Sequence, residues 1–482
     1  MSTINTEVLP TKGPKYLSVA DTIAESIRSG DLAADNKLPP VRDLAYQLGI
    51  TPGTVARAYT VLTNKGLLRA EVGRGTFVAG NDERELPDDG APFGQNNSLS
   101  PIEIDVVPHG SHGTIAARWP VSLFSPGLPE LGQAGIIRRL LAEVAQEPPS
   151  GLMHYPSHAS SEQARIAVLN WLDNVRLGRV DEDDIVLANG GQNAILIILQ
   201  SILRGPRPTV LVEELSYPGF RRAADLLRAP VVPVAMDKDG LIPEALEEAA
   251  RTYGAQVICT SPDVQNPTGI FTPIKRREAI VDVARRLDLQ IVEDACYQSS
   301  GIPVPSYRML APERGWYLSS LSKTITPGLR VGYAVAPEAQ SANLRRSADH
   351  SFFGLSAPIV DLTAKLLMHP EAIALEGKVR RAFDQYIRSA VNHLGIYELT
   401  WRESVPFLWL RLPKGWRAAA FCQAAEAQGV QIRSAEEFVA REARAPHAVR
   451  IAVNAMIPLD IFDEAMVRLR RLLDNPPERI SV

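Results

Sequence analysis

Residues 316–332, "WYLSSLSKTITPGLRVG", join an apolar run to a serine-rich turn, one lysine and an arginine seven positions beyond it. The run has the length and composition of a buried strand, so Lys323 directly follows a predicted strand. A single lysine in that position is ordinarily a surface residue. The remainder of the chain therefore decides whether Lys323 belongs to a functional site.

Short apolar runs alternate with longer helical patterns from about residue 119 onward. The other runs include "DIVLANG" (184–190), "TVLVEE" (209–214), "AQVICTSP" (255–262) and "LQIVEDA" (289–295). Strands that alternate with helices predict a mostly parallel sheet with helices on both faces. We therefore expect an α/β domain, with a small α+β lobe beginning near residue 370.

The 482-residue chain is longer than one ordinary domain, and its composition changes twice along its length. Residues 1–80 are dense and periodic, residues 81–118 are rich in Pro, Gly, Asn and acidic residues, and residues 119–482 carry the α/β pattern. Residues 81–104 hold six acidic residues and one arginine, a composition that cannot bury a core. We expect two domains joined by an acidic, polar linker.

The composition excludes several classes of protein. With 45% hydrophobic residues and a net charge of −4, the chain is typical of a soluble globular protein, and any DNA binding must be local to one domain. No apolar run approaches the roughly 20 residues that span a bilayer, and no signal-peptide pattern is present. The three cysteines have neither paired nor metal-ligand spacing. We expect a cytoplasmic protein with no metal site and no membrane partner.

Residues 15–80 show three helical patterns followed by a hairpin. The segments are "SVADTIAESIRSGDL" (18–32), "PPVRDLAYQLG" (39–49), "ITPGTVARAYTVLTNKG" (50–66) and "LLRAEVGRGTFVAG" (67–80). Two helices joined by a tight turn that contains glycine predict a helix-turn-helix, and the hairpin has the form of a wing. Other small helical domains share these elements, so the individual residues must distinguish them.

This N-terminal segment closely resembles the winged helix of GntR-family regulators over its whole length, which implies binding to double-stranded DNA. The residues to which that resemblance assigns DNA contacts are Arg42, Thr51, Thr54, Arg57, Arg74, Gly75 and Thr76. Pro52 and Gly53 depart from the family, which often carries Arg and a polar residue there. Residues 1–80 hold nine Lys/Arg and seven Asp/Glu, so one domain should bind DNA weakly and a dimer should read two half-sites.

The C-terminal segment offers the groups that a pyridoxal 5'-phosphate pocket needs. The candidates are Asp294 for the ring nitrogen, Tyr297 and Asn266 for the phenolate oxygen, Tyr217 for the ring face, and the backbone amides of Gly191 and Gln192 with Ser320, Ser322 and Arg330 for the phosphate. Taken singly, each has an ordinary structural explanation, such as a turn or a strand-end acid. Together they favour a cofactor site around Lys323.

In order and spacing these residues resemble the fold-type I aminotransferases over about 360 residues. That resemblance implies that Lys323 is the Schiff-base lysine, that Tyr155 reaches the phosphate of a neighbouring subunit in a homodimer, and that Arg450 binds a substrate α-carboxylate. The chain departs from the family pattern at Ala159 and Ala164, at Leu215 and Ser216, and at Val405 and Pro406. The last pair replaces two glycines and is expected to crowd the substrate side, which puts efficient turnover in doubt.

A GntR-type winged helix, a linker and an aminotransferase-like domain in this order resemble the MocR group of regulators. The resemblance implies a transcriptional regulator that senses an amino acid or related amine through external aldimine formation. Two alternatives stay open. One is an active aminotransferase with an ancillary DNA-binding domain, and the other is a DNA-binding protein whose second domain only dimerises and binds no cofactor. The sequence identifies neither the effector nor the operator, nor whether binding activates or represses.

Overall fold

The computed structural model describes residues 15–64, 67–71, 75–79, 120–146, 151–298, 304–440 and 444–476. The contacts between Cα atoms divide the chain into two compact units, Met1–Ile102 and Glu103–Val482. The linker predicted at 81–118 lies outside the described residues. Within the described ranges no helix is long and apolar enough to cross a membrane.

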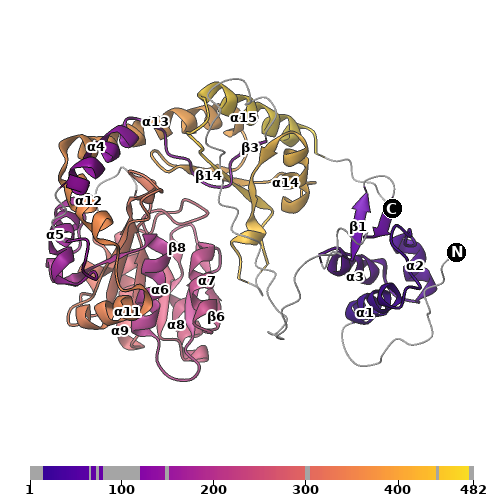
Figure 1. Ribbon diagram of the computed structural model, residues 1–482, viewed down its shortest axis with the longest axis horizontal. Coiled ribbons are helices and arrows are strands. Elements are labelled where there is room, and N and C mark those ends of the chain that lie inside the picture. The colour runs from indigo at the N-terminus through magenta and orange to yellow at the C-terminus, as the bar shows by residue number, and fades with distance from the viewer. Residues whose placement is uncertain are drawn as a thin grey trace. The chain divides into compact units, whose positions relative to one another are not determined.

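The first unit is a small helical domain with a two-stranded hairpin (Figure 1). Its elements are α1 (Lys15–Arg28), α2 (Val41–Gln47), α3 (Pro52–Asn64), β1 (Leu68–Glu71) and β2 (Gly75–Val78). The apolar residues at helical spacing in α1, Val19, Ile23 and Ile27, are at most 5% exposed and pack against α2 and α3. Gly49 turns the chain between α2 and α3 at a φ of +61°, a conformation that favours glycine. The predicted helix-turn-helix and hairpin are therefore both present.

The second unit is built on a seven-stranded sheet in the order β4-β12-β11-β10-β9-β5-β6. The strands are β4 (Ile185–Ala188), β5 (Val210–Glu213), β6 (Val231–Val234), β9 (Val257–Thr260), β10 (Gln290–Asp294), β11 (Gly315–Ser320) and β12 (Gly332–Val335). Only β12 runs against its neighbours, β4 and β11. The sheet is therefore mostly parallel, as predicted.

Successive residues of a strand point to opposite faces of the sheet, and helices pack against both faces. On one face, Val210 and Val212 pack with α6 (Gly190–Ile202), α7 (Pro218–Leu226) and α11 (Ser341–Phe352). On the other face, Leu211 packs with α8 (Pro243–Tyr253), α9 (Ile274–Arg286) and α10 (Tyr307–Leu310). A second core on this face contains Leu187 of β4 and residues of α4 (Gln133–Gln146), α5 (Glu162–Trp171) and α12 (Ala357–Met368). The strands are thus almost wholly buried.

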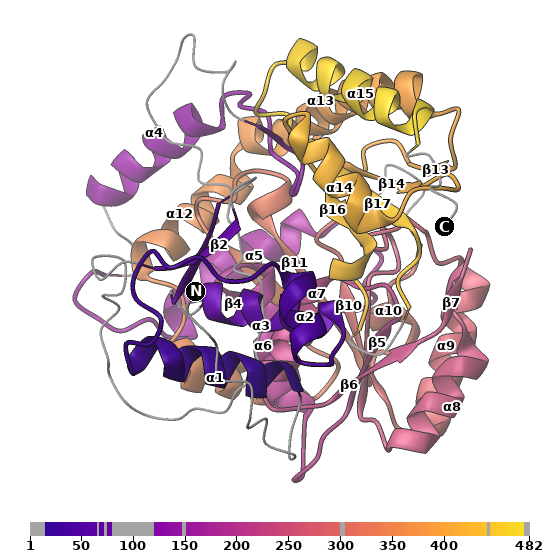
Figure 2. The ribbon, with the colours of Figure 1, turned by 90° about the vertical axis from the view of Figure 1, so that its right-hand side faces the viewer.

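The α+β lobe follows the long helix α13 (Pro370–Leu394). It contains a four-stranded sheet of β13 (Leu399–Thr400), β14 (Phe407–Arg411), β17 (Ala448–Ala452) and β16 (Arg433–Ser434), with α14 (Ala418–Ala427) and α15 (Leu459–Asp474). Figures 1 and 2 show α13 and α15 side by side, where Ser389 donates a 2.7 Å hydrogen bond to Asp463. Elsewhere in the unit, β3 (Val121–Ser122) pairs with β15 (Val430–Gln431), and β7 (Met236–Asp237) pairs with β8 (Gly240–Leu241).

Helix α13 belongs to two hydrophobic cores at once. Its first turns, with Ala372 and Leu375, pack into the core beneath the large sheet. Later residues, including Phe383 and Ile387, pack into the core of the α+β lobe. This one helix therefore joins the two lobes of the second unit mechanically.

Candidate functional site

The predicted cofactor residues gather at one edge of the large sheet. Six of the seven strands run in the same direction, and their carboxyl ends share that edge, where ligands bind in open α/β sheets. Gly191, Tyr217, Asn266 and Lys323 follow β4, β5, β9 and β11 respectively, and Asp294 is the last residue of β10. Since β12 runs the opposite way, Arg330, just before it, lies at the same edge.

Lys323 ends a short 3-10 turn, Leu321–Lys323, which continues from β11. Its Nζ atom lies 5.8 Å from the centroid of the Tyr297 ring. Burial lowers the pKa of this amine from 10.5 to about 8, and the positive charges of Arg450 and Arg330 act in the same direction. A larger fraction of the amine is therefore neutral near pH 7, the form required of a nucleophile.

Asp294 ends β10 and faces the same site. The backbone N–H of Cys296 donates a 2.9 Å hydrogen bond to its Oδ1 atom. Burial raises the pKa of the carboxyl, while hydrogen bonds from Cys296 and the charge of Lys323 lower it. A carboxylate held in this way gains from a cationic partner such as a protonated ring nitrogen.

The groups predicted to hold a phosphate surround the start of α6. Gly190 adopts a φ of +79°, and a Cβ atom added there would lie 2.5 Å from the Arg330 guanidinium. A Cβ atom added at Gly191 would lie 2.9 Å from the sulfur of Cys296 and 3.9 Å from Ser320. The turn, both glycines and the two side-chain donors are thus brought together around a helix N-terminus.

Ser322 supplies an orphaned donor in the same region. Its Oγ atom is buried and has no hydrogen-bond partner within the part of the chain that the structure describes. Buried hydroxyls are normally paired, so an orphaned one indicates a missing ligand atom or water. The site therefore fits an anionic group of several oxygens such as a phosphate.

Tyr217 is positioned by the first turns of α6 and α7. Its hydroxyl donates to Oε1 of Gln192 at 3.3 Å, and Nε2 of Gln192 donates to the Gly219 carbonyl at 2.9 Å. A Cβ atom at Gly219 would lie 2.0 Å from the Tyr217 ring, so only glycine fits there. Sequence reasoning missed Gly219, although the "SYPGF" segment gave a signal in the glycine directly after the tyrosine and proline.

Arg450 and Asn266 meet across the two lobes of the second unit. Nη1 of Arg450 donates to Oδ1 of Asn266 at 2.8 Å, and Nη2 donates to the carbonyl of Phe124. Nε is buried and has no partner in the described ranges. Burial lowers the pKa of the guanidinium to about 10, and it lies 4.8 Å from the Phe438 ring centroid. A buried arginine with one free N–H can accept a carboxylate ligand.

A depression reaches Lys323 from between the two lobes. Its walls include Cys296 and Tyr297 on one side, Glu376 and Phe383 of α13 on the other, and Pro406 of the α+β lobe. Val405, expected to crowd the substrate side, is instead 1% exposed and packs with Val264, Phe407 and Tyr297. Of the two residues that replace glycines, Pro406 alone lines the depression.

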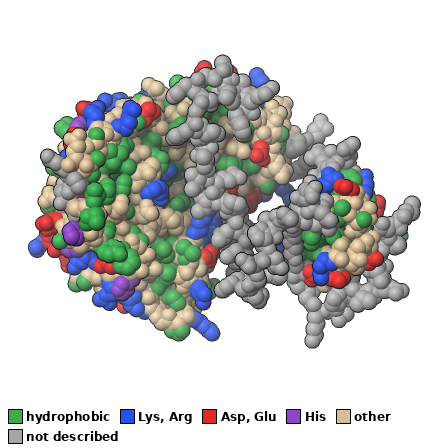
Figure 3. All heavy atoms as spheres, in the orientation of Figure 1, with side chains coloured by type: hydrophobic (Ala, Val, Ile, Leu, Met, Phe, Trp, Pro, Cys, Tyr) green, Lys and Arg blue, Asp and Glu red, His purple; other side chains and the backbone are tan. Residues whose placement is uncertain are grey.

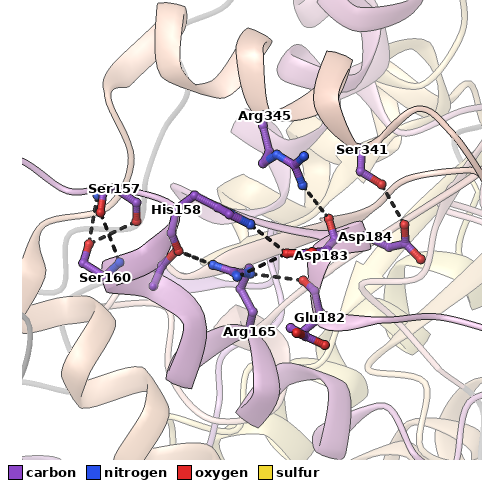
Figure 4. Close-up of polar contacts among 10 residues, drawn as sticks. Ser157, His158, Ser160, Arg165, Glu182, Asp183, Asp184, Ser341 and Arg345 are labelled. Carbon is purple, nitrogen blue, oxygen red and sulfur yellow. Dashed lines mark hydrogen bonds and ion pairs between the residues drawn. The ribbon is translucent and has the colours of Figure 1, made fainter.

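Tyr155 lies away from these residues in the single chain. Its side chain is 86% exposed, and its ring centroid is 6.3 Å from that of Phe353. The segment after it is well anchored, as Figure 4 shows: Arg165 donates to the carbonyls of His158 and Glu182, and the His158 ring bonds Asp183 at 2.8 Å. An ordered segment therefore presents an exposed tyrosine.

In the first unit, most of the predicted DNA contacts are accessible. Arg42, Thr51 and Arg57 are exposed, and the hydroxyls of Thr51 and Thr54 lie 2.9 Å apart. Thr76 pairs with Ala70 in the hairpin, while Arg74 lies outside the described residues.

One further cationic side chain, Lys37, lies close to the hairpin, and Arg57 contacts an aromatic ring. The Arg57 guanidinium stacks 4.3 Å from the Tyr16 ring centroid. Gly75 has a φ of +122°, and a Cβ atom there would lie 2.8 Å from Cε of Lys37. Sequence analysis missed Lys37, because its contact with the wing arises from the tertiary fold.

Comparisons with known proteins agree with this two-part arrangement. Residues 131–469 match the family model "Aminotransferase class I and II", and residues 15–78 match "Bacterial regulatory proteins, gntR family". The uncharacterized HTH-type transcriptional regulator YdeF of Bacillus subtilis is 28% identical over 96% of this chain and 95% of its own. The probable rhizopine catabolism regulatory protein MocR of Rhizobium meliloti is 28% identical over 69% of this chain and 67% of its own.

A solved structure supports the fold of the second unit. The multiple substrate aminotransferase of Thermococcus profundus superposes with a TM-score of 0.66 at 21% identity, covering 74% of this chain and 92% of that protein. The aminotransferase model spans more than half of the 482 residues. The chain therefore belongs to the aminotransferase class I and II family, and it carries ahead of that domain a helix-turn-helix domain of the gntR family of bacterial regulatory proteins.

Proposed function

We propose that this protein is a DNA-binding transcriptional regulator that depends on pyridoxal 5'-phosphate and senses an amino acid or related amine. One observation carries the proposal: the half-buried Lys323, whose amine has its pKa lowered to about 8, occurs in the same chain as a gntR-family domain. Such a regulator would act on double-stranded DNA in the cytoplasm.

The residues fit the cofactor. Ser322, Ser320 and Arg330, with the backbone amides of Gly191 and Gln192, would hold its phosphate, because they converge on a helix N-terminus and one hydroxyl has no partner in the described chain. When bound, pyridoxal phosphate withdraws electrons from a bound amine.

The other side chains would hold the ring. Asp294 would pair with a protonated ring nitrogen, Tyr297 and Asn266 would donate to the phenolate oxygen, and Tyr217 would cover one face. Lys323 would provide the neutral amine that attaches the cofactor. These roles follow from the positions of the side chains at one sheet edge and from the enclosure of the Asp294 carboxyl.

Arg450 makes a carboxylate-bearing effector the best candidate. Its free Nε and its contact with Asn266 would let a carboxylate bind beside the ring without a large rearrangement. Because Arg450 comes from the α+β lobe and Lys323 from the large domain, an amino acid held by both would link the two lobes. An amine without a carboxylate would use only one of them.

We further propose a homodimer that reads two half-sites. Figure 3 shows hydrophobic side chains gathered on one face of the second unit, and the exposed large hydrophobics of this unit include Leu141, Leu152, Met153, Tyr155 and Phe353. Isolated apolar residues are normal on surfaces, but a larger group supports an interface. Tyr155 would then reach the phosphate of the second copy.

The test is a screen of amino acids and related amines for a change in the visible spectrum of the cofactor-loaded protein. Hits are then repeated in a DNA-binding assay with the protein's own upstream region. The proposal expects compounds that change both readouts, and it expects Lys323→Ala to lose the visible band. If the protein binds no cofactor, the alternative in which the second domain only dimerises would remain. A spectral change without any effect on DNA binding would contradict the sensory role.

The hydrogen bond between Arg450 and Asn266 also favours a second candidate, an active aminotransferase. The residues proposed above to hold the cofactor would serve such an enzyme equally. Incubation with an amino acid and a keto acid separates the two functions. Sustained product formation would support the enzyme, whereas a single stoichiometric conversion or none would support the regulator.

A further inference from the structure

Beneath the site lies a buried carboxyl group to which none of the roles above refers. Glu213 ends β5 and is 1% exposed. Thr260 donates to its Oε1 atom at 2.7 Å, Gln265 Nε2 donates to its Oε2 atom at 3.0 Å, and the Ser261 backbone N–H also donates to the carboxyl. Burial raises the pKa of the group to about 7 despite these donors. Burying a carboxyl group is unfavourable, so a buried carboxyl with three hydrogen-bond donors indicates that it positions a specific partner.

That partner is Gln265, which is fully buried and directly precedes Asn266. Its Oε1 atom accepts from the N–H of Thr268 at 3.0 Å and from the Thr268 hydroxyl at 2.5 Å. Its Nε2 atom donates to Glu213 and to the carbonyl of Leu215. Since Oε1 must face the two donors of Thr268, the amide cannot flip, and its N–H groups must find acceptors on β5.

The network therefore joins two segments that approach the cofactor site separately. The turn containing Gln265 carries Asn266, which holds Arg450. The exit from β5, whose Leu215 carbonyl Gln265 binds, continues two residues later into Tyr217. Glu213 and Gln265 thus link the segment that carries Asn266 to the segment that carries Tyr217.

We propose that Glu213 is a positioning residue: by accepting from Gln265 it holds Asn266 and Tyr217 in register at the pyridoxal phosphate site. The inference rests on the proposed function. It predicts that acceptor oxygens at position 213 matter more than its negative charge, because a glutamine there can still accept from Gln265 and donate to the Thr260 hydroxyl. An apolar residue of similar size would leave Nε2 of Gln265 short of an acceptor.

The test compares three variants of the full chain. Glu213→Leu removes both acceptors, Glu213→Gln retains one, and Glu293→Leu is the matched control. Glu293 is also a buried glutamate, on the neighbouring strand but one, and it accepts from the Tyr307 backbone N–H at 2.7 Å and pairs with Arg277 at 3.8 Å rather than with Gln265. The readouts are the dissociation constant for pyridoxal phosphate, the visible circular dichroism per bound cofactor, and the urea midpoint of the cofactor-free protein.

Glu213→Leu should weaken cofactor binding by about tenfold or more, the loss expected when a hydrogen bond to a charged group is removed, and should reduce the visible dichroism even at saturation. Glu213→Gln should stay within about threefold of the unaltered protein. Glu293→Leu should lower the urea midpoint but keep both cofactor readouts. Equal losses in the two leucine variants, or unaltered cofactor readouts in Glu213→Leu, would overturn the proposal. If the unaltered protein binds no cofactor, the proposed function itself fails, which is a different outcome.

Discussion

The lowered pKa of Lys323 predicts how cofactor attachment depends on pH. Attachment requires the neutral amine, and burial brings the pKa from 10.5 to about 8. That lowering corresponds to roughly 3 kcal/mol. At pH 7 roughly one amine in ten is then neutral, against roughly one in three thousand for an ordinary lysine, a gain of about 300-fold.

The assay follows the growth of the visible band after rapid mixing with pyridoxal phosphate between pH 6 and pH 9.5. The rate should rise about tenfold per pH unit at first and level off near pH 8, while a free lysine derivative should keep rising. Arg450 lowers the Lys323 pKa, so Arg450→Gln should move the midpoint to higher pH. Arg346→Gln, at an exposed position of α11, is the matched control and should not move it.

The same shift has a consequence for the stability of the cofactor-free protein. Between pH 8 and pH 10.5 the unfolded chain binds more protons at Lys323 than the folded chain, so the free energy of unfolding should rise with pH across that window.

A rate that rises steadily to pH 9.5 with no change of slope would refute the assigned pKa. A midpoint that moves to lower pH in Arg450→Gln would refute its electrostatic cause.

Four further substitutions test other parts of the structure. Gly75→Ala should destabilise the winged helix by about 1–2 kcal/mol and weaken DNA binding, because the glycine has a φ of +122° and Lys37 Cε would lie 2.8 Å from the new Cβ. Gly53→Ala, where a Cβ meets nothing within 4 Å, should instead stabilise α3 by up to about 1 kcal/mol, and thermal melts measure both. Arg42→Gln should lower the slope of log affinity against log salt by about 1 for every DNA sequence, as salt titrations would show. Val405→Ala should cost about 1–3 kcal/mol in urea unfolding and reduce the visible dichroism, since Val405 packs against Tyr297.

The gathering of the candidate site residues at one edge could be predicted from the sequence, because it follows from the sheet. Apolar runs mark the strands, and parallel strands bring their carboxyl ends to one edge, so residues at or soon after the ends of the runs lie near one another. Lys323, Asp294 and Asn266 are all of this kind. The helix-turn-helix was equally accessible, since Val19, Ile23 and Ile27 recur at helical spacing and are buried.

Contacts between distant segments could not be predicted in the same way. Gln265 and Glu213 are 52 residues apart, and nothing in either segment alone indicates that one binds the other. The crossing of Lys37 over Gly75 likewise depends on how the hairpin packs. Likewise, the direction of Val405 could not be predicted: of the two residues expected to crowd the substrate side, only Pro406 lines the depression, because Val405 packs into a small apolar cluster.

The way a bound amino acid would act on the second unit follows from where its two ends would be held. Its amino group would lie at Lys323, in the large domain, and its carboxylate at Arg450, in the α+β lobe. Among the described residues α13 packs into both cores, so a change in the angle between the lobes would bend or shift this helix. A ligand shifts such an equilibrium only through a difference in affinity for the two arrangements. An amine without a carboxylate would contact only the large domain and would supply little of this difference in affinity. The proposed function therefore requires that the compounds which alter DNA binding be a subset of those which alter the spectrum, and that loss of the Arg450 guanidinium remove the first effect before the second.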